Sequence, residues 1–190
     1  MGYPVLSLRP LAREDIERVR CWRNQERIRR NMLSDAQISV AGQQAWFEAL
    51  TTDPGRRHLL VELDGHPVGC LYYARIRERQ AELGYYLGEE RIWPGTGVLL
   101  ELAALDHAFD RLELDTLFAE VLEHNPGPQR LHDLFGFERV GVREAVVVRD
   151  GEPLAALRFR YRNEDWRARR AAVLAALPRP VREAAARMEI

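Results

Sequence analysis

Apolar residues along the chain follow two kinds of repeat, and the first is the short alternating run that predicts a β-strand. These runs are rich in Val, Leu, Phe and Tyr, and Gly, Pro or Asp residues bound most of them. Turn sequences at 64–67 and 149–152 predict two hairpins. The pattern predicts about seven strands, at 5–8, 58–63, 68–74, 81–87, 116–122, 137–142 with 145–148, and 154–161.

The second repeat has the period of an amphipathic helix. It predicts helices at 14–24, 40–50, 97–110, 126–134 and 164–177. Ser39 is a predicted N-cap, Gln44 is expected on the apolar face of its helix, and Pro178 ends the last helix. The mixed order predicts an α+β (α/β) architecture with a central, mostly antiparallel, seven-stranded mixed sheet flanked by helices. We place one domain at 1–167 and a C-terminal helical tail at 168–190.

Composition narrows the class of protein and of chemistry. The 190 residues, 46% of them hydrophobic, suit one core, and a net charge of −1 argues against a nucleic-acid partner. All 28 basic residues are Arg, which excludes a Lys Schiff base. We expect a cytoplasmic protein without a membrane partner, because there is neither a signal-type segment nor an 18-residue apolar run. The five His and two Cys lack metal-ligand spacing, so we expect no metal.

A glycine turn follows the predicted strand 81–87. The sequence Trp-Pro-Gly-Thr-Gly-Val at 93–98 leads from a loop into the next predicted helix. Backbone N–H groups at a helix N-terminus bind phosphate well, and glycine leaves them accessible. The candidate phosphate-binding residues are therefore Gly95, Thr96, Gly97 and Val98. A simple turn without a ligand is the alternative.

A second motif lies further along the chain. Asn125 precedes the predicted helix 126–134, and Gly136 and Phe137 follow it. The chain thus has, in order, a strand, a glycine turn, a helix, a strand, an Asn-capped helix and Gly-Phe. This order resembles the GNAT superfamily of acyl-coenzyme A N-acyltransferases. Ile92 stands where that superfamily usually has Gln or Arg.

The resemblance implies the GNAT fold and direct transfer of an acetyl group from acetyl-CoA to an amine in a ternary complex. In that fold the strand before the glycine turn splays from its neighbour, and acyl-CoA pairs with the open strand edge. The backbone of Tyr85, Tyr86 and Leu87 would bind the cofactor, and one N–H there would stabilise the oxyanion. Asn125 would complete the cofactor site. Ordinary strand packing is the alternative for both Tyr residues.

His132 occupies the position where the superfamily commonly has a Tyr near the leaving sulfur. A thiol has a pKa of about 8.5, so an imidazolium can protonate the departing thiolate. We hypothesise that His132 is the general acid. A spacer beside coenzyme A, with water protonating the thiolate, is the alternative.

Glu82 lies on the strand that would face both substrates. An acceptor amine must lose a proton to attack the thioester, and a carboxylate within reach can take that proton. We hypothesise that Glu82 is the general base. A surface Glu paired with an Arg is the alternative, and Glu120 is a less favoured carboxylate.

The N-terminal segment combines Trp22, Arg23, Asn24 and Met32, with Trp46 following on the next helix. This combination resembles the acceptor site of bacterial nucleotide-sugar N-acetyltransferases that act on a UDP-4-amino-4,6-dideoxy sugar in pseudaminic-acid biosynthesis. An Arg can pair with a diphosphate, and aromatic or thioether groups can carry a base or a deoxy-sugar methyl. The alternative is that both Trp residues belong to the core.

Two other functions stay open. Residues 82–85 also resemble ribosomal-protein alanine N-acetyltransferases, which modify protein N-termini. A non-catalytic module that binds coenzyme A is the other alternative, favoured by Ile92 and by His132 in place of Tyr. We expect a small-molecule substrate and leave a homodimer open.

Overall fold

A seven-stranded mixed sheet forms the centre of the protein in the computed structural model, which describes residues 2–190. Its spatial order is β1-β2-β3-β4-β5-β7-β6, and all neighbours are antiparallel except the parallel pair β4 and β5. The strands are β1 (Leu6–Pro10), β2 (Arg57–Leu63), β3 (His66–Arg77), β4 (Gln80–Leu87), β5 (Thr116–Leu122), β6 (Glu138–Arg149) and β7 (Glu152–Arg162). The predicted sheet and fold class are confirmed.

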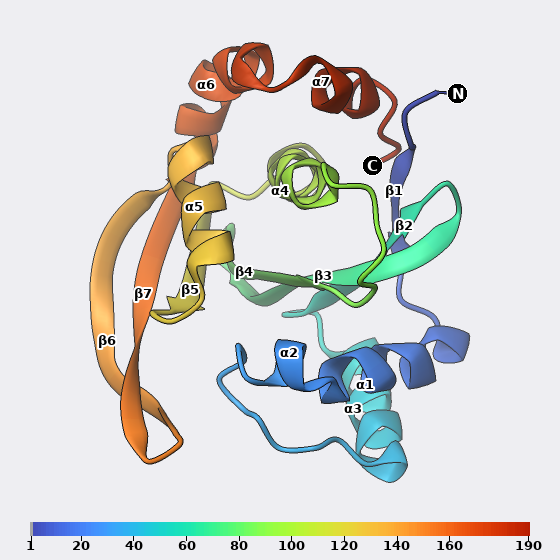
Figure 1. Ribbon diagram of the computed structural model, residues 1–190, viewed down its shortest axis with the longest axis vertical. Helices are drawn as coiled ribbons and strands as arrows, with labels where there is room; N and C mark the ends of the chain where they lie inside the picture. The colour runs from blue at the N-terminus through green and yellow to red at the C-terminus, as the bar shows by residue number, and fades with distance from the viewer. Residues whose placement is uncertain (1) are drawn as a thin grey trace.

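Helices cover both faces of the sheet (Figure 1). The N-terminal helices lie on one face and are α1 (Ile16–Asn24), α2 (Glu26–Arg29) and α3 (Val40–Thr52). The other face carries α4 (Thr96–Asp106), α5 (Pro126–Phe135), α6 (Asn163–Ala176) and α7 (Arg179–Ala185). The predicted cap of α3 is confirmed, because the Ser39 hydroxyl accepts a hydrogen bond from the Gly42 amide at 3.0 Å.

The alternation of side chains along β4 separates two apolar cores. Leu83 and Tyr85 pack into the larger core, between the sheet and α4. Tyr86 points the other way, into the smaller core beneath α1 and α3. This follows from the two-residue period of a strand, which sends successive side chains to opposite faces. Each residue of β4 is thereby assigned to one face of the sheet.

The structure differs from the sequence expectations mainly where the backbone is irregular. β6 is one strand rather than two pieces, because bulges absorb the irregular stretch in which Ala145 has a φ of 50°. The helix expected at 97–110 loosens into a π-helical turn at His107–Arg111. The last residues, whose hydrophobic pattern predicts no particular element, form α7, which packs against the larger core.

Candidate active site

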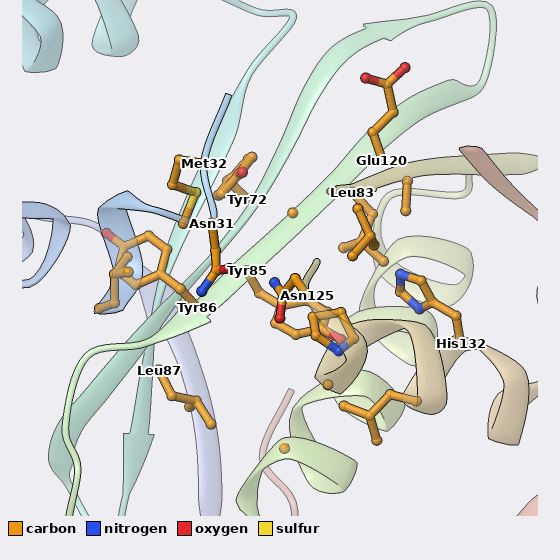
Figure 2. A pocket seen from close by; sticks show the side chains of 18 of the residues that line it. Asn31, Met32, Tyr72, Leu83, Tyr85, Tyr86, Leu87, Glu120, Asn125 and His132 are labelled. Atoms are coloured by element: carbon orange, nitrogen blue, oxygen red, sulfur yellow. The ribbon is translucent and has the colours of Figure 1, made fainter. Parts of the chain in front are cut away.

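The main cavity, of about 360 Å³, lies in the gap between β4 and β5. The two strands pair only from Gln80 opposite Thr116 to Leu83 opposite Ala119, although they continue to Leu87 and Leu122. Beyond Leu83 the two strand edges face the cavity instead of each other. Side chains from β4, β5, α5 and the segment after α2 converge on it (Figure 2).

The start of α4 borders this cavity and supplies backbone donors. Gly97 lines the cavity, and its amide and that of Val98 occupy the first turn, where the helix itself offers no acceptor. Within residues 2–190 neither amide bonds to a loop carbonyl. Both donors are therefore available to an anion.

Gly95 and Thr96 build the turn rather than face the cavity. Thr96 is wholly buried, and its amide and hydroxyl both donate to the Trp93 carbonyl, at 3.0 and 2.6 Å. Gly95 packs against the Trp93 ring so closely that a Cβ would overlap it. Half of the predicted phosphate-binding set thus has a structural role.

Asn125 lies at the N-cap position of α5 and lines the cavity. The predicted side-chain cap is wrong, because Asn125 makes no capping hydrogen bond. Pro in the first turn already lacks one of the amide donors that a cap would satisfy. The predicted end of the helix is confirmed, with Gly136 left-handed at a φ of 88°. The Asn125 amide group is therefore free to contact a ligand.

His132 lies on α5 against the same cavity and is buried. Its Nδ1 atom is 3.3 Å from Oε1 of Glu101, a wholly buried residue of α4. The Tyr85 hydroxyl donates to the other carboxylate oxygen of Glu101. A group of three polar side chains, two of them buried and Tyr85 partly buried, thus borders the coenzyme side of the gap, although sequence reasoning singled out only two of the three.

Glu82 lies on the opposite face of the sheet from His132. Its carboxylate pairs with Arg75 and lines a small adjoining pocket together with Glu120. Glu120 also lines the main cavity and pairs with Arg143 at 2.9 Å. The structure therefore places the carboxylates of Glu82 and Glu120 on the side of the gap that faces the N-terminal helices, and the imidazole of His132 on the side that faces α4 and α5.

A second cavity, of about 480 Å³, lies between the sheet and the N-terminal helices. Arg23, Trp46 and His58 line it, and Tyr72 and Tyr86 line both this cavity and the main one. The His58 ring stacks on Tyr72, with ring centroids 5.1 Å apart and planes at 12°. Burial lowers the pKa of His58 to about 4, and the positive charge of Arg56 adds to this effect. His58 is therefore neutral at neutral pH.

The predicted acceptor residues divide between cavities and core. Arg23 and Trp46 line the second cavity, and Met32 lines the main one. Trp22 is 3% exposed and packs in the core, where its indole N–H donates to Glu89 at 2.9 Å. Asn24 holds the loop at Ile38 with two hydrogen bonds, of 2.8 and 2.9 Å. Trp22 and Asn24 support the site and line none of the cavities described here.

Several residues of the site escaped sequence reasoning. They are Arg27, Asn31, Gln43, His58 and Glu101. Gln43, not Gln44, is buried on α3, and its side-chain nitrogen lacks a hydrogen-bond partner. The helical face was misjudged by one residue, because a polar residue in an apolar period gives no signal of burial. A Glu within the apolar run of α4 was the one available sign of Glu101.

Two kinds of feature are absent from residues 2–190. No three His, Cys, Asp or Glu side chains there gather closely enough to hold a metal ion. No helix in that same range is long and apolar enough to cross a membrane.

Solved structures with the same architecture are acetyltransferases. The spermidine N-acetyltransferase from Vibrio cholerae in complex with CoA and spermine has a TM-score of 0.80 and 22% identity, covering 85% of this chain and 97% of that one. A structure of the V. cholerae spermidine/spermine enzyme with manganese ions has a TM-score of 0.75 and 21% identity, covering 87% and 96%. A dodecameric structure of the spermidine enzyme has a TM-score of 0.74 and 21% identity, covering 85% and 95%. At these identities the likeness shows a shared fold.

Comparison at the level of sequence gives the family. None of the curated proteins compared with the chain matches it. The acetyltransferase (GNAT) domain family matches residues 6–138, which is more than half of the chain and includes the β4–β5 gap, α4 and α5. The chain therefore belongs to the GNAT acetyltransferase domain family and is an acetyl-CoA-dependent N-acetyltransferase.

Proposed function

We propose that this enzyme acetylates the amine of a nucleotide-linked amino sugar of the UDP-4-amino-4,6-dideoxy-hexose type. The observation that carries this proposal is the charge of the second cavity. Arg23 is its one permanently charged lining residue among those described, and no Asp or Glu lines it. A guanidinium pairs well with a diphosphate, and the flat rings of Trp46 and Tyr72 suit a base or sugar.

The main cavity suits acetyl-CoA as the co-substrate. The free amides of Gly97 and Val98 would bind its diphosphate, while the open edge of β4 at Tyr85–Leu87 would pair with the pantetheine arm. Asn125 would contact the same arm, since its side chain is not used as a cap. The CoA complex of the V. cholerae enzyme, which shares this fold, supports the placement.

Proton transfer would use both sides of the gap. Glu82 is the proposed base for the acceptor amine and would act through water, because it lines the adjoining pocket but not the main cavity. Glu120 is the alternative base, because it lines the main cavity itself. His132 is the proposed acid for the thiolate, because it lines the coenzyme side. We expect Glu82→Gln to lower kcat more than Glu120→Gln when pH–rate profiles of both variants are compared. The reverse order would transfer the role to Glu120.

A polyamine is the rival acceptor, suggested by the spermidine enzymes that share the fold. A polyamine is positively charged at neutral pH, and Arg23 would repel it. Arg23 also has its guanidinium carbon 6.0 Å from the centre of the Tyr86 ring, which holds the charge beside the wall common to both cavities. This electrostatic difference makes the two acceptors separable by experiment.

The test is an acceptor panel with release of CoA as the readout. We expect transfer to a UDP-4-amino-4,6-dideoxy sugar, and little to spermidine or to a peptide with a free N-terminus. Arg23→Gln should raise KM for the nucleotide sugar by roughly 10–100-fold, as for loss of a charged hydrogen-bonding partner. Arg18→Gln is the matched control, because Arg18 lies on the same helix and lines none of the cavities.

Each other outcome overturns a specific part of the proposal. Preferred turnover of spermidine, increased further by Arg23→Gln, would assign a polyamine acceptor. Preferred turnover of the peptide would assign N-terminal acetylation. CoA binding without transfer to any amine of the panel would exclude all three acceptors.

We also propose that the chain forms a homo-oligomer, with a homodimer as the simplest case. β6 is an edge strand, and it exposes Val142 and Val148, which are 47% and 61% accessible. The V. cholerae enzyme has a dodecameric structure, which supports the proposal by analogy of fold. Light scattering coupled to gel filtration tests it, and a monomer at all concentrations would refute it.

A further inference from the structure

Glu101 is a carboxylate in an apolar setting. It lies in the middle of α4, is 0% exposed, and is surrounded along the helix by Leu100, Leu102 and Ala104, which are also 0% exposed. A buried carboxylate is costly unless hydrogen bonds or a cation compensate for the lost water. The chain therefore needs a partner for it within the core.

Two side chains supply partners. Oε2 accepts the hydrogen bond of the Tyr85 hydroxyl, and Oε1 lies 3.3 Å from Nδ1 of His132. Both Oε1 and Nδ1 are buried, and neither makes a hydrogen bond to any other group of residues 2–190, so this 3.3 Å contact is the polar approach that each of them has. No Arg lies within ion-pair distance of Glu101 in the described chain. His132 is thus the cation-forming group available to this carboxylate.

The neighbouring phenols are fixed in the protonated state. Burial, and next the charge of Glu101, raises the pKa of Tyr73 and Tyr85 well above the ordinary value. The Tyr73 hydroxyl donates to the Ala104 carbonyl at 2.8 Å, and the Tyr85 hydroxyl donates to Glu101. At neutral pH both hydroxyls therefore stay protonated and act as hydrogen-bond donors.

Aromatic rings hold the imidazole in place. Its centroid is 4.2 Å from that of Phe137 and 4.9 Å from that of Phe159. The carboxylate of Glu101 lies beside Nδ1 of this ring, and His132 also lines the main cavity on the coenzyme side of the gap. In such an arrangement the hydrogen bond at one ring nitrogen decides which proton the other nitrogen carries.

We propose that Glu101 is a positioning residue, which holds a proton on Nδ1 of His132 and stabilises the imidazolium so that Nε2 can protonate the departing thiolate. This rests on the proposed acetyl transfer and on His132 as its acid. When the C–S bond of the tetrahedral intermediate breaks, its electron pair goes to sulfur and the Nε2 proton follows. Neutral His132 remains, with Nδ1–H bonded to Glu101. The proton that the acceptor amine releases balances the proton that sulfur gains.

A double-mutant cycle tests the coupling. Glu101→Gln keeps the volume and an oxygen for the Tyr85 hydroxyl but loses the charge. We expect it to lower kcat about 10–100-fold while KM for acetyl-CoA stays within about twofold, as for an interaction used in the transition state. Because Glu101 acts through His132, the double variant Glu101→Gln/His132→Phe should have the same kcat as His132→Phe alone. Additive losses would overturn the proposal.

Asp106→Asn is the matched control. Asp106 is also a buried carboxylate of α4, but it pairs with Arg170 at 2.7 Å and lines none of the cavities. We expect it to lower the melting temperature and leave kcat unchanged. A fall in kcat as large as that of Glu101→Gln would show that any lost carboxylate on α4 impairs the enzyme, and would overturn the proposal.

Nitrogen-15 NMR of the histidine rings gives a readout that needs neither an acceptor amine nor a substitution of Glu101. The His132 signal is assigned by its loss in His132→Phe. We expect a protonated, slowly exchanging Nδ1, whereas an Nδ1 without a proton would overturn the proposal. If this proton is present and no nucleotide amino sugar is acetylated, the acceptor proposal fails alone.

Discussion

His58 lies between the rings of Trp46 and Tyr72, at the wall of the second cavity. Its Nδ1 has no hydrogen-bond partner, and burial lowers its pKa to about 4. Cys70 lies on the same wall, and burial raises the pKa of its thiol to about 12. Both side chains are therefore uncharged at neutral pH, which leaves Arg23 as the charge that a ligand meets.

The low pKa of His58 predicts a loss of stability in mild acid. The unfolded chain binds a proton at His58 below about pH 6.5, whereas the folded chain does so only near pH 4. The unfolded state thus binds more protons in this window, so stability falls as pH falls. We expect His58→Phe, which keeps an aromatic ring, to remove about 2 kcal/mol of the difference in unfolding free energy between pH 7.5 and 5.

Urea unfolding at the two pH values measures this effect. His66→Gln is the control, because His66 is exposed at the start of β3, and it should keep the wild-type pH dependence. Equal pH dependence in His58→Phe and the wild type would contradict the prediction.

At the scale of the element, β4 is paired further along one of its edges than along the other. β3 pairs with it through to Leu87, whereas β5 pairs with it only as far as Leu83. Gly84 lies where pairing with β5 ends, and a Cβ there would overlap the Tyr72 ring. Its missing side chain allows Tyr72 to lie across β4 and form a wall of all three pockets. The gap thus depends on one glycine and on the splay of two strands.

A substitution in the first turn of α4 tests the proposed phosphate binding. A Cβ at Gly97 would meet Leu131 at 3.7 Å, an ordinary contact, so the protein itself tolerates Gly97→Ala. We expect a gain of about 0.5–1 kcal/mol in unfolding free energy, because Ala fits this position and leaves the unfolded chain less conformational freedom than Gly does. KM for acetyl-CoA should nevertheless rise about tenfold, since the methyl group would keep a phosphate from the amide.

Steady-state kinetics and thermal unfolding of the same variant check both parts. Gly141→Ala on β6 is the control, because a Cβ there meets nothing within 4 Å and Gly141 lines none of the cavities. An unchanged KM in Gly97→Ala would place the diphosphate elsewhere.

At the scale of the whole molecule, the C-terminal segment closes the layer over α4 (Figure 1). Leu177, Val181 and Ala184 are buried in the larger core. The segment then returns to β1, where the Glu189 amide donates to the Leu6 carbonyl at 2.9 Å. The proposed division into a domain at 1–167 and a tail at 168–190 is therefore a division of sequence motifs, while the packing of the two parts is continuous.

This packing predicts that the tail stabilises the catalytic domain. Deleting residues 178–190 removes the buried Val181 and the partly buried Met188 and Ile190 from the larger core. It should lower the unfolding free energy by roughly 3–6 kcal/mol, since burying each large apolar side chain contributes about 1.5–3 kcal/mol. Arg179→Ala is the control, because its side chain is 79% exposed, and it should change little. Denaturant unfolding measures both, and equal stability of the truncated and full chains would show that residues 178–190 are dispensable for stability.

The sequence by itself determined the order of the elements and the two motifs on which the fold rests. Strand alternation, the helical period, the Ser39 cap and the Gly136 stop act between neighbours in the chain, so they can be read locally. The same locality explains why the glycine turn before α4 and the position of Asn125 before α5 were predictable.

Only the tertiary structure decided which of the predicted residues share a cavity. It placed Trp22 in the core, Glu82 and His132 on opposite faces of the sheet, and Glu101 beside His132. These relations depend on where β4 leaves β5 and on the packing of α4 against α5, which bring together groups distant in the chain. A buried Glu within an apolar helix acquires its meaning from such a partner, because hydrogen bonding inside the core decides whether a charge can be held there.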